Sequence, residues 1–392
     1  MAKTGIRWIA VLGFVACVGT KARALSRMDG EARPKKTQEA GNLFPFFEKG
    51  RWGYMDGRGK TIIRPRYESA SDYNEGLADV RVGKKWSFIN GQGKIAFSLP
   101  KTWESIGGFS EGLALFRVKQ KYGFFNRRGE VVVSPNYDDV QPFSNGLAAV
   151  NVGATVVHTV AGQDQEGGKW GYIDTTGRLV IPIRFDLVFD FSDGVAKVWE
   201  GKKGGFIDKK GAMVLKEKKQ PWEATQFSEG LAVASLSQRE GFIDKKGQWA
   251  IPARFKEAGK FSEGLAAVRL DKKWGFINRK GKFVIAPRFK EVKPYSQGRA
   301  RVRNGKAWTF INRKGKAVVR PKKACSAPQV FNAAEDFSGG LGRVHVGGKL
   351  MEVYDAPWYW KGGAWYYVNR KGDIVRRCRR DKDSGNSGRA VP

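Results

Sequence analysis

Histidine is almost absent from this 392-residue sequence. His158 and His345 are its two histidines, and neither lies in a zinc-binding spacing or beside a cysteine, so metal-ligand and general-base roles are not expected for them. Its glycine-rich segments recur at a fixed period as hairpin turns and are not phosphate loops followed by helices. We therefore predict no catalytic residue, no cofactor and no metal site, and we expect the protein not to be an enzyme.

Cysteine is also scarce, with three residues, and the first of them lies in a stretch that resembles an export signal. Lys3 and Arg7 precede an apolar segment, 8–18, and a small-residue site ends at Ala24. This pattern predicts a signal peptide over 1–24. The apolar segment is short for a membrane span, although a retained anchor is an alternative. A second alternative is lipoprotein processing before Cys17, which would leave a lipid anchor.

Cleavage after Ala24 would leave Cys325 and Cys378 as the remaining cysteines. An even pair in an exported chain predicts one disulfide, and the alternative is two separate thiols.

Acidic residues are few relative to basic ones. The chain has 71 Lys and Arg against 38 Asp and Glu, a formal net charge of +33. Such an excess predicts attraction to polyanions with a strong dependence on salt. The alternative is that the charge only keeps a long β array soluble and protects its strand edges.

What the sequence has in abundance is one motif, seen most clearly in residues 273–282, Lys-Trp-Gly-Phe-Ile-Asn-Arg-Lys-Gly-Lys. The glycines that close its copies are 34, 36, 48, 34, 36, 34, 34 and 57 residues apart, at Gly59, Gly93, Gly129, Gly177, Gly211, Gly247, Gly281, Gly315 and Gly372. A period of this length indicates a tandem array in which each unit buries its apolar face against its neighbours.

Each period has room for three strands and no helix. Trp274 to Ile277 is an aromatic and β-branched run, and Asn278 to Gly281 has the composition of a hairpin turn closed by a glycine with positive φ. Because both faces of this run carry apolar or very small residues, Gly275 is expected where another backbone approaches too closely for a Cβ.

The predicted fold is all-β, a tandem array of eight to nine three-stranded hairpin repeats of about 35 residues each. Unequal unit lengths and an aromatic last unit favour an open, solenoid-like array, and a closed, propeller-like ring is the alternative.

The Trp-Gly-Phe-Ile-Asp-x-x-Gly hairpin, the Pro-x-x-Phe strand end and the Ser-Glu-Gly-Leu-Ala strand resemble the WG-repeat family, also called KWG repeats. The resemblance covers roughly residues 43–376. It implies an all-β repeat array used for binding or scaffolding, in a family without shared catalytic residues. We divide the chain into a signal peptide (1–24), a flexible leader (25–42), the array (43–376, with inserts at 155–168 and 349–363) and a basic, disordered tail (377–392).

Three sets of residues are candidates for binding. Basic pairs precede many of the closing glycines and would align along one edge of a stacked array, where they match a linear polyanion: Arg127, Arg128, Lys209, Lys210, Lys245, Lys246, Arg279, Lys280, Arg313, Lys314, Arg370 and Lys371. A second possible row of cations is Arg66, Arg184, Arg254 and Arg288. Aromatic residues near the end could stack on sugar rings or, as we favour, cap the last unit: Trp358, Tyr359, Trp360 and Trp365.

These observations lead us to expect an exported protein, periplasmic or extracellular, that binds anionic polymers or protein partners without catalysing a reaction. The alternative is a protein that recognises or acts on carbohydrates through the aromatic cluster.

Overall fold

The computed structural model describes residues 42–159, 162–216, 223–305, 307–318, 331–346, 349–353, 356–361 and 364–380, without the side chains of 156–159, 162–165, 349–353, 356–361 and 377–380. All of them belong to the compact unit Ala40–Pro392. The predicted signal peptide, nearly all of the leader, Cys17, Cys325 and most of the basic tail lie outside the described residues.

Unit 7 shows how the repeat folds. β23 (Glu257–Ala258), β24 (Leu265–Leu270), β25 (Lys273–Asn278) and β26 (Phe283–Phe289) form an antiparallel sheet in that order. The last three are the predicted strands, and the two-residue β23 is an addition that the sequence pattern did not predict. In β25, Phe276 and Ile277 are both buried, so each face of the sheet is covered by a neighbour.

The other units follow the same order, with small variations in strand number. Unit 1 holds β1 (Phe44–Glu48), β2 (Arg51–Met55) and β3 (Thr61–Tyr67); unit 2, β4 (Ser69–Ala70), β5 (Leu77–Val82), β6 (Lys85–Asn90) and β7 (Ile95–Ser98); unit 3, β8 (Ser105–Ile106), β9 (Leu113–Val118), β10 (Lys121–Asn126) and β11 (Val131–Tyr137); unit 4, β12 (Asp139–Val140), β13 (Leu147–Thr159), β14 (Gly162–Asp174) and β15 (Leu179–Phe185).

Unit 5 holds β16 (Leu187–Val188), β17 (Val195–Glu200), β18 (Lys203–Asp208) and β19 (Met213–Lys216); unit 6, β20 (Ala232–Leu236), β21 (Arg239–Ile243) and β22 (Trp249–Phe255); unit 8, β27 (Glu291–Ser296), β28 (Arg299–Asn304) and β29 (Ala307–Ile311); unit 9, β30 (Phe331–Ala334), β31 (Leu341–Val346), β34 (Ala364–Asn369) and β35 (Ile374–Arg380). Units 8 and 9 share one sheet through β29 and β30. The described part of the chain contains no helix long and apolar enough to cross a membrane.

The core lies between consecutive units. In each pair the aromatic residue of the Trp-Gly-Phe strand packs against the aromatic residue before the next unit's Ser-Glu-Gly turn. The ring centroids of Phe242 and Phe261 are 4.8 Å apart, and those of Phe276 and Tyr295 are 5.0 Å apart. Burial of apolar surface thus couples each unit to the next, as the tandem-array interpretation requires.

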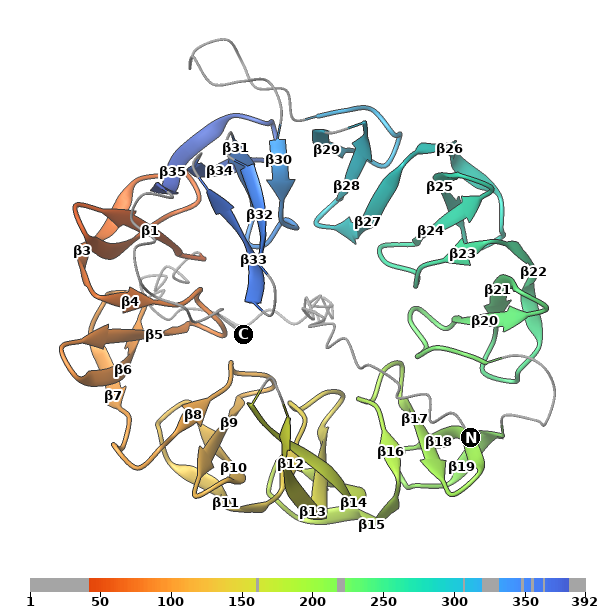
Figure 1. Ribbon diagram of the computed structural model, residues 1–392, viewed down its shortest axis with the longest axis horizontal. Coiled ribbons are helices and arrows are strands. Elements are labelled where there is room, and N and C mark those ends of the chain that lie inside the picture. The colour runs from red at the N-terminus through yellow and green to blue at the C-terminus, as the bar shows by residue number, and fades with distance from the viewer. Residues whose placement is uncertain are drawn as a thin grey trace, which may run out of the picture. The chain divides into compact units, whose positions relative to one another are not determined.

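The first and last units also pack against each other. The Tyr367 hydroxyl donates a hydrogen bond of 2.9 Å to the carbonyl of Pro45, and the Phe44 and Tyr367 rings lie 5.6 Å apart. In Figure 1 the units succeed one another around a ring, with β35 beside β1 and with outer strands such as β7, β11 and β22 at the periphery.

The all-β repeat array is therefore confirmed, its individual sheets are open, and none of them closes into a barrel. Contact between its ends corresponds to the ring-like alternative and not to the open array that unequal unit lengths favoured. The lengths did not prevent closure because the extra residues of units 4 and 9 form hairpins that leave the ring.

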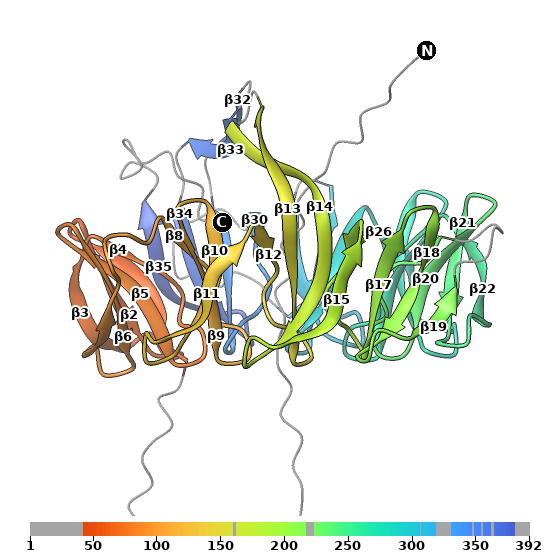
Figure 2. The ribbon, with the colours of Figure 1, turned by 90° about the horizontal axis from the view of Figure 1, so that it is seen from below.

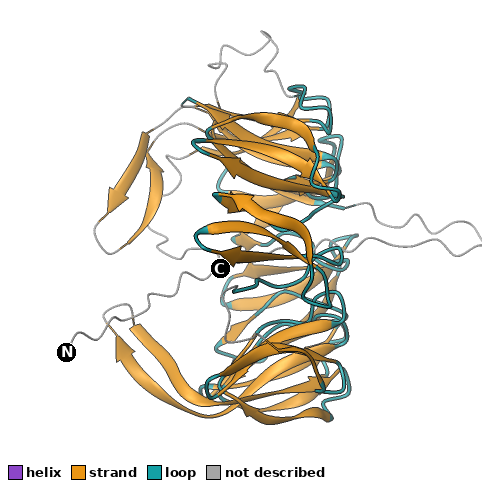
Figure 3. Cartoon of the chain, turned by 90° about the vertical axis from the view of Figure 1, so that its right-hand side faces the viewer, coloured by secondary structure: helices purple, strands orange, loops and turns teal. Residues whose placement is uncertain are grey.

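Two such hairpins mark one face of the ring. β13 and β14 pair from Leu147 opposite Asp174 to Thr159 opposite Gly162, which places the predicted insert at a long hairpin tip. β32 (Lys349–Val353) and β33 (Ala356–Lys361), inserted between β31 and β34, form a separate hairpin. Both rise from the same side in Figures 2 and 3. We call this side the hairpin face. β35 extends to Arg380, four residues beyond the predicted end of the array at 376.

Candidate polyanion-binding face

The Asp/Asn-x-x-Gly turns lie on the opposite face, because successive antiparallel connections alternate between the two ends of a sheet. We call it the turn face. In unit 7 the Asn278 Oδ1 atom accepts hydrogen bonds from the backbone N–H groups of Lys280 (3.0 Å) and Lys282 (3.1 Å), and Gly281 has a φ of 74°. The predicted turn chemistry is confirmed, and the same bonds recur from Asp56 to Asn369.

All twelve predicted turn cations are exposed. Because the turns share one backbone geometry, they present these side chains in equivalent positions in units 3, 5, 6, 7, 8 and 9. Closure of the array changes the predicted straight row into an arc around one face. Units 1, 2 and 4 interrupt the pairs, with Gly57-Arg58, Gly91-Gln92 and Thr175-Thr176 at the same positions.

The first cation of a pair leans toward the preceding unit. The Lys245 Nζ atom donates to the carbonyl of Asp193, and the Arg370 Nη2 atom donates to Gln297 Oε1 over 3.1 Å. Arg279 lies so close to Gly230 that a Cβ there would be 3.2 Å from its Nη2 atom. The second cation uses its backbone N–H in the turn, as Lys280 does, while its side chain points to solvent.

The acidic residues on this face are occupied by contacts between units. The Glu229 carboxylate accepts a hydrogen bond of 2.9 Å from the backbone N–H of Gly264 in the next unit. The same contact joins six more pairs of units, from Glu75 to Gly112, Glu111 to Gly146, Asn145 to Gly194, Asp193 to Gly230, Glu263 to Gly298 and Gln297 to Gly340. We call this contact the acid clasp.

Eleven of the twelve turn cations have no carboxylate partner within the described part of the chain, and eight of them belong to the consecutive units 5 to 8: Lys209, Lys210, Lys245, Lys246, Arg279, Lys280, Arg313 and Lys314. Arg128, by contrast, pairs with Glu130 over 3.0 Å. Several basic residues nearer the other end of the strands are paired too, such as Arg117 with Glu104. Units 5 to 8 therefore form a continuous run of four units whose turn cations have no carboxylate partner among the described residues.

The second predicted row of arginines has a structural role. Arg254 stacks over the Phe255 ring at 5.1 Å and donates through Nη2 to the carbonyl of Gly281 in the next unit, 2.7 Å away. Arg66, Arg184 and Arg288 make the equivalent contacts. Their guanidinium groups hold neighbouring units together, so we do not include them in the binding surface.

The predicted aromatic cluster is divided between two sheets. Trp358, Tyr359 and Trp360 belong to β33, whereas Trp365 belongs to β34, where its ring lies 5.2 Å from that of His345. Of the predicted disulfide pair, Cys378 lies in β35 without a described side chain, and Cys325 lies outside the described residues.

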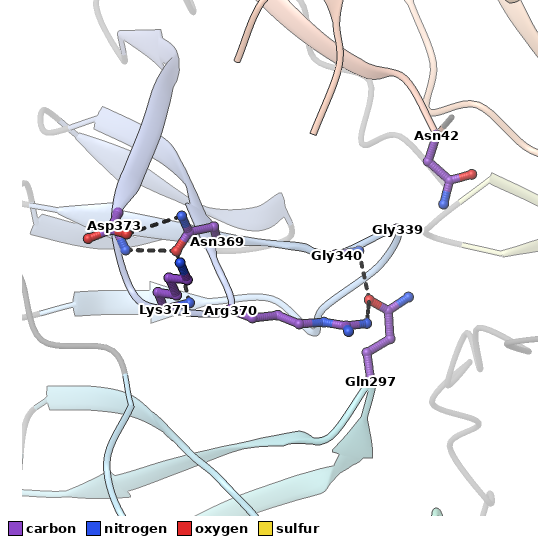
Figure 4. A pocket seen from close by; sticks show the side chains of 8 residues that line it. All are labelled: Asn42, Gln297, Gly339, Gly340, Asn369, Arg370, Lys371 and Asp373. Atoms are coloured by element: carbon purple, nitrogen blue, oxygen red, sulfur yellow. Dashed lines mark hydrogen bonds between the residues drawn. The ribbon is translucent and has the colours of Figure 1, made fainter. Parts of the chain in front are cut away.

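A shallow pocket lies between units 8 and 9, with Asn42 of the first unit at its edge (Figure 4). Its polar contacts converge on Gln297, whose Oε1 atom accepts hydrogen bonds from the Gly340 N–H (2.7 Å) and from Arg370. Gly339 stands where other units have the clasp acid, and Asn42 lies against it. The pocket is thus an acid clasp with a neutral amide in place of a carboxylate.

Titratable groups do not converge on a reaction centre within the described ranges, where no cluster of three or more His, Cys, Asp and Glu could hold a metal ion. Among the described carboxyl groups, Asp190 has the most strongly raised pKa, and burial raises it to about 6. Burial likewise raises the pKa of Tyr295 to about 12. Asp190 lies beside the core contact of units 4 and 5, near Tyr172, and burial alone accounts for its raised pKa.

One surface feature was not predicted from the sequence. Most outer strands carry an apolar residue at their first or second position, and eight such residues are exposed: Ile62, Ile95, Val131, Leu179, Met213, Val214, Phe283 and Val284. Their position two or three residues after a closing glycine was visible in the repeat. Their exposure was not, because a strand of a stacked array is expected to be covered on both faces.

The family model for the WG containing repeat matches residues 52–86, 86–122, 122–154, 170–203, 241–274 and 274–306, together just over half of the chain. No curated protein matches the chain in sequence.

A solved structure shares its fold. A crystal structure of a eukaryotic initiation factor has 10% sequence identity and a TM-score of 0.55, over 87% of this chain and 97% of that chain. The dihydro-heme d1 dehydrogenase NirN in complex with DHE has 12% identity and a TM-score of 0.43, over 89% and 75% of the two chains. At such identities the likeness concerns the fold alone. The repeated family matches identify the chain itself, which belongs to the WG-repeat family.

Proposed function

We propose that this protein is a non-catalytic binding scaffold that engages anionic polymers through the turn face. The observation that carries the proposal is the arc of turn cations in units 5 to 8, which are exposed, equivalently placed and without a carboxylate partner among the described residues. Closely spaced uncompensated cations attract a polyanion because binding releases its condensed counterions. No base-specific or sugar-specific contact is needed.

This function agrees better with the structure than carbohydrate recognition does. A sugar-stacking platform needs aromatic rings side by side on one surface, whereas Trp365 and the residues of β33 belong to different sheets. The turn cations, in contrast, share one face.

The test is salt-dependent retention on heparin, a soluble polyanion. The eight-residue variant replaces Lys209, Lys210, Lys245, Lys246, Arg279, Lys280, Arg313 and Lys314 by Ser or Gln. The turn-forming Asp or Asn and the Gly remain, so the fold is expected to survive. We expect elution at markedly lower salt and a shallower dependence of log affinity on log salt, by roughly 0.7 to 0.9 for each lost contact.

The hairpin face supplies a matched control, because eight exposed cations lie at its strand ends: Lys84, Lys85, Lys119, Lys202, Lys203, Arg239, Lys272 and Lys273. Replacing them removes the same formal charge, and we expect the smaller loss of retention. A third variant replaces Arg377, Arg379 and Arg380 by Gln and tests the basic residues at the start of the tail. Equal retention of the turn-face variant and the hairpin-face variant would refute the proposal and reduce the turn cations to a solvated edge.

We further propose that the protein is exported. Support comes from the sequence of residues 1–24 alone. Sequencing the amino terminus of the mature protein distinguishes cleavage after Ala24 from processing before Cys17, and an unprocessed Met1 would contradict export by either route.

A further inference from the structure

The exposed apolar residues at the starts of the outer strands lie next to the turn cations. In unit 3, Val131 is 50% exposed and follows Arg127 and Arg128; in unit 7, Phe283 is 39% exposed and follows Arg279 and Lys280. Units 2 and 4, which lack a basic pair, still have a basic residue next to an exposed apolar residue. Lys94 precedes Ile95, which is 65% exposed, and Arg178 precedes Leu179.

Repetition distinguishes this feature from the scattered apolar residues of ordinary surfaces. The outer strands β3, β7, β11, β15, β19 and β26 all begin at the turn face and carry an exposed apolar side chain at their first or second residue. These strands form the periphery of the ring (Figure 1). One edge of the turn face is therefore both basic and apolar; we call it the apolar rim and define it by Ile62, Ile95, Val131, Leu179, Met213, Val214, Phe283 and Val284.

A soluble polyanion would use the cations of this edge and leave the apolar rim in water. The surface of an anionic bilayer can contact both the cations and the apolar rim. Its headgroups attract Lys and Arg, and the boundary with the acyl chains takes up apolar side chains. We propose that the turn face docks on an anionic phospholipid bilayer, with the turn cations at the headgroups and the apolar rim inserted just below them. This inference rests on the proposed function, since the same cations act in both.

Binding would be peripheral. The two hairpins lie on the opposite face, so a bilayer at the turn face leaves β13–β14 and β32–β33 directed away from it (Figure 2). Each basic residue near an anionic surface strengthens binding about fivefold, and the effect is screened by salt. Insertion of apolar side chains adds a contribution that salt does not remove.

The test is flotation of the full chain with two kinds of vesicle, phosphatidylcholine alone and phosphatidylcholine containing roughly one third phosphatidylglycerol. The rim variant is Ile95→Ser with Val131→Ser. The matched control is Val82→Ser with Val152→Ser, because Val82 and Val152 are 57% and 43% exposed and lie toward the hairpin face. Heparin retention of every variant is measured in parallel.

We expect the parent to float with the anionic vesicles and not with phosphatidylcholine alone. The rim variant should lose about fivefold to tenfold in vesicle affinity, with heparin retention unchanged, and the control should change less than about twofold. Equal vesicle binding by the rim variant and the parent, or heparin retention without any vesicle binding, would overturn the bilayer proposal and leave the proposed function in place. If the parent protein is not retained on heparin, the proposed function itself is overturned.

Discussion

At the scale of single residues, the repeat is governed by close backbone contacts that only glycine permits. A Cβ on Gly275 would lie 2.5 Å from the carbonyl oxygen of Ile285 and 2.8 Å from the nitrogen of Pro287, where β26 shifts register. In unit 2, Ser87 occupies the equivalent position and its Oγ atom is 2.9 Å from that of Ser98. There β7 has no proline and Ser87 pairs directly with Ser98. The glycine does not require the proline, because Gly205 of unit 5 pairs directly with Lys216 of the proline-free β19 and a Cβ there would lie 2.5 Å from the carbonyl oxygen of Leu215.

A buried acid gives a prediction at this scale. Burial raises the pKa of Asp190 to about 6, and its Oδ1 atom has no hydrogen-bond partner among the described residues. The folded state therefore binds this proton more tightly than the unfolded state, so the stability from Asp190 is present below about pH 4 and is lost as the pH rises through 6. Asp190→Asn should raise the free energy of unfolding at pH 8 by about 1–2 kcal/mol.

Urea unfolding of the parent and Asp190→Asn at pH 8 and pH 4 measures this effect. The difference between the two proteins should be much smaller at pH 4, where Asp190 is neutral in the folded protein. A gain of the same size at both pH values would show that ionisation of Asp190 is not its cause.

At the scale of elements, the acid clasp is the recurrent contact between turns. Glu229 has a positive φ of 55° and accepts the N–H of Gly264 from the next unit. Glu229→Ala should lower the free energy of unfolding by about 1–2 kcal/mol, because a charge-assisted hydrogen bond is lost and a partly buried N–H is left without it.

Glu229→Asp is the control for this prediction. Asp193 makes the same contact to the N–H of Gly230 one unit earlier, so the shorter acid is compatible with the clasp. Urea unfolding should place Glu229→Asp close to the parent. Equal destabilisation by Ala and Asp would mean that the backbone at this position, and not the clasp, determines stability.

Elements are also where prediction from sequence was most successful. The strands, the Asp/Asn-x-x-Gly turns and the close approach at Gly275 follow from residue types at a fixed period, and all three are confirmed. The two-residue inner strands, such as β23, were missed because a strand that short has no periodic pattern. The acid clasp was visible only as a recurring acid, since its partner lies in another unit.

At the scale of the whole molecule, closure was beyond the sequence pattern because it depends on contacts between residues more than 300 positions apart. Arg376 makes these contacts, and they resemble the arginine contacts that hold neighbouring units together, such as the one from Arg254 to the carbonyl of Gly281. Its Nη1 atom approaches the carbonyl of Gly59 (3.5 Å) and donates to Thr61 Oγ1 (2.8 Å), Nη2 pairs with Glu48 (3.1 Å), and the guanidinium stacks over Phe46. The role of Arg376 in joining the last unit to the first could not be predicted from the sequence, because the sequence does not show that the two ends of the array meet.

Arg376→Ala should therefore destabilise the ring by about 2–3 kcal/mol, since it removes a cation–π contact and several hydrogen bonds at a partly buried site. Arg184→Ala is the comparison within the ring, where a more exposed arginine stacks over the Phe185 ring but makes only long polar contacts, of 3.5 Å to the Gly211 carbonyl and 3.9 Å to Glu200. Thermal unfolding should show the larger decrease in midpoint for Arg376→Ala. Equal decreases would argue against a special contribution of the contact between the first and last units.

The central claim is that the turn face, and not the hairpin face, meets the anionic partner. Both faces carry lysines in one chain, so lysine modification with and without saturating heparin, read residue by residue by mass spectrometry, tests it most directly. Our account predicts protection of Lys209, Lys210, Lys245, Lys246, Lys280 and Lys314, with unchanged reactivity of Lys84, Lys202 and Lys272 on the hairpin face. Equal protection of the two sets, or protection of the hairpin-face lysines alone, would contradict it.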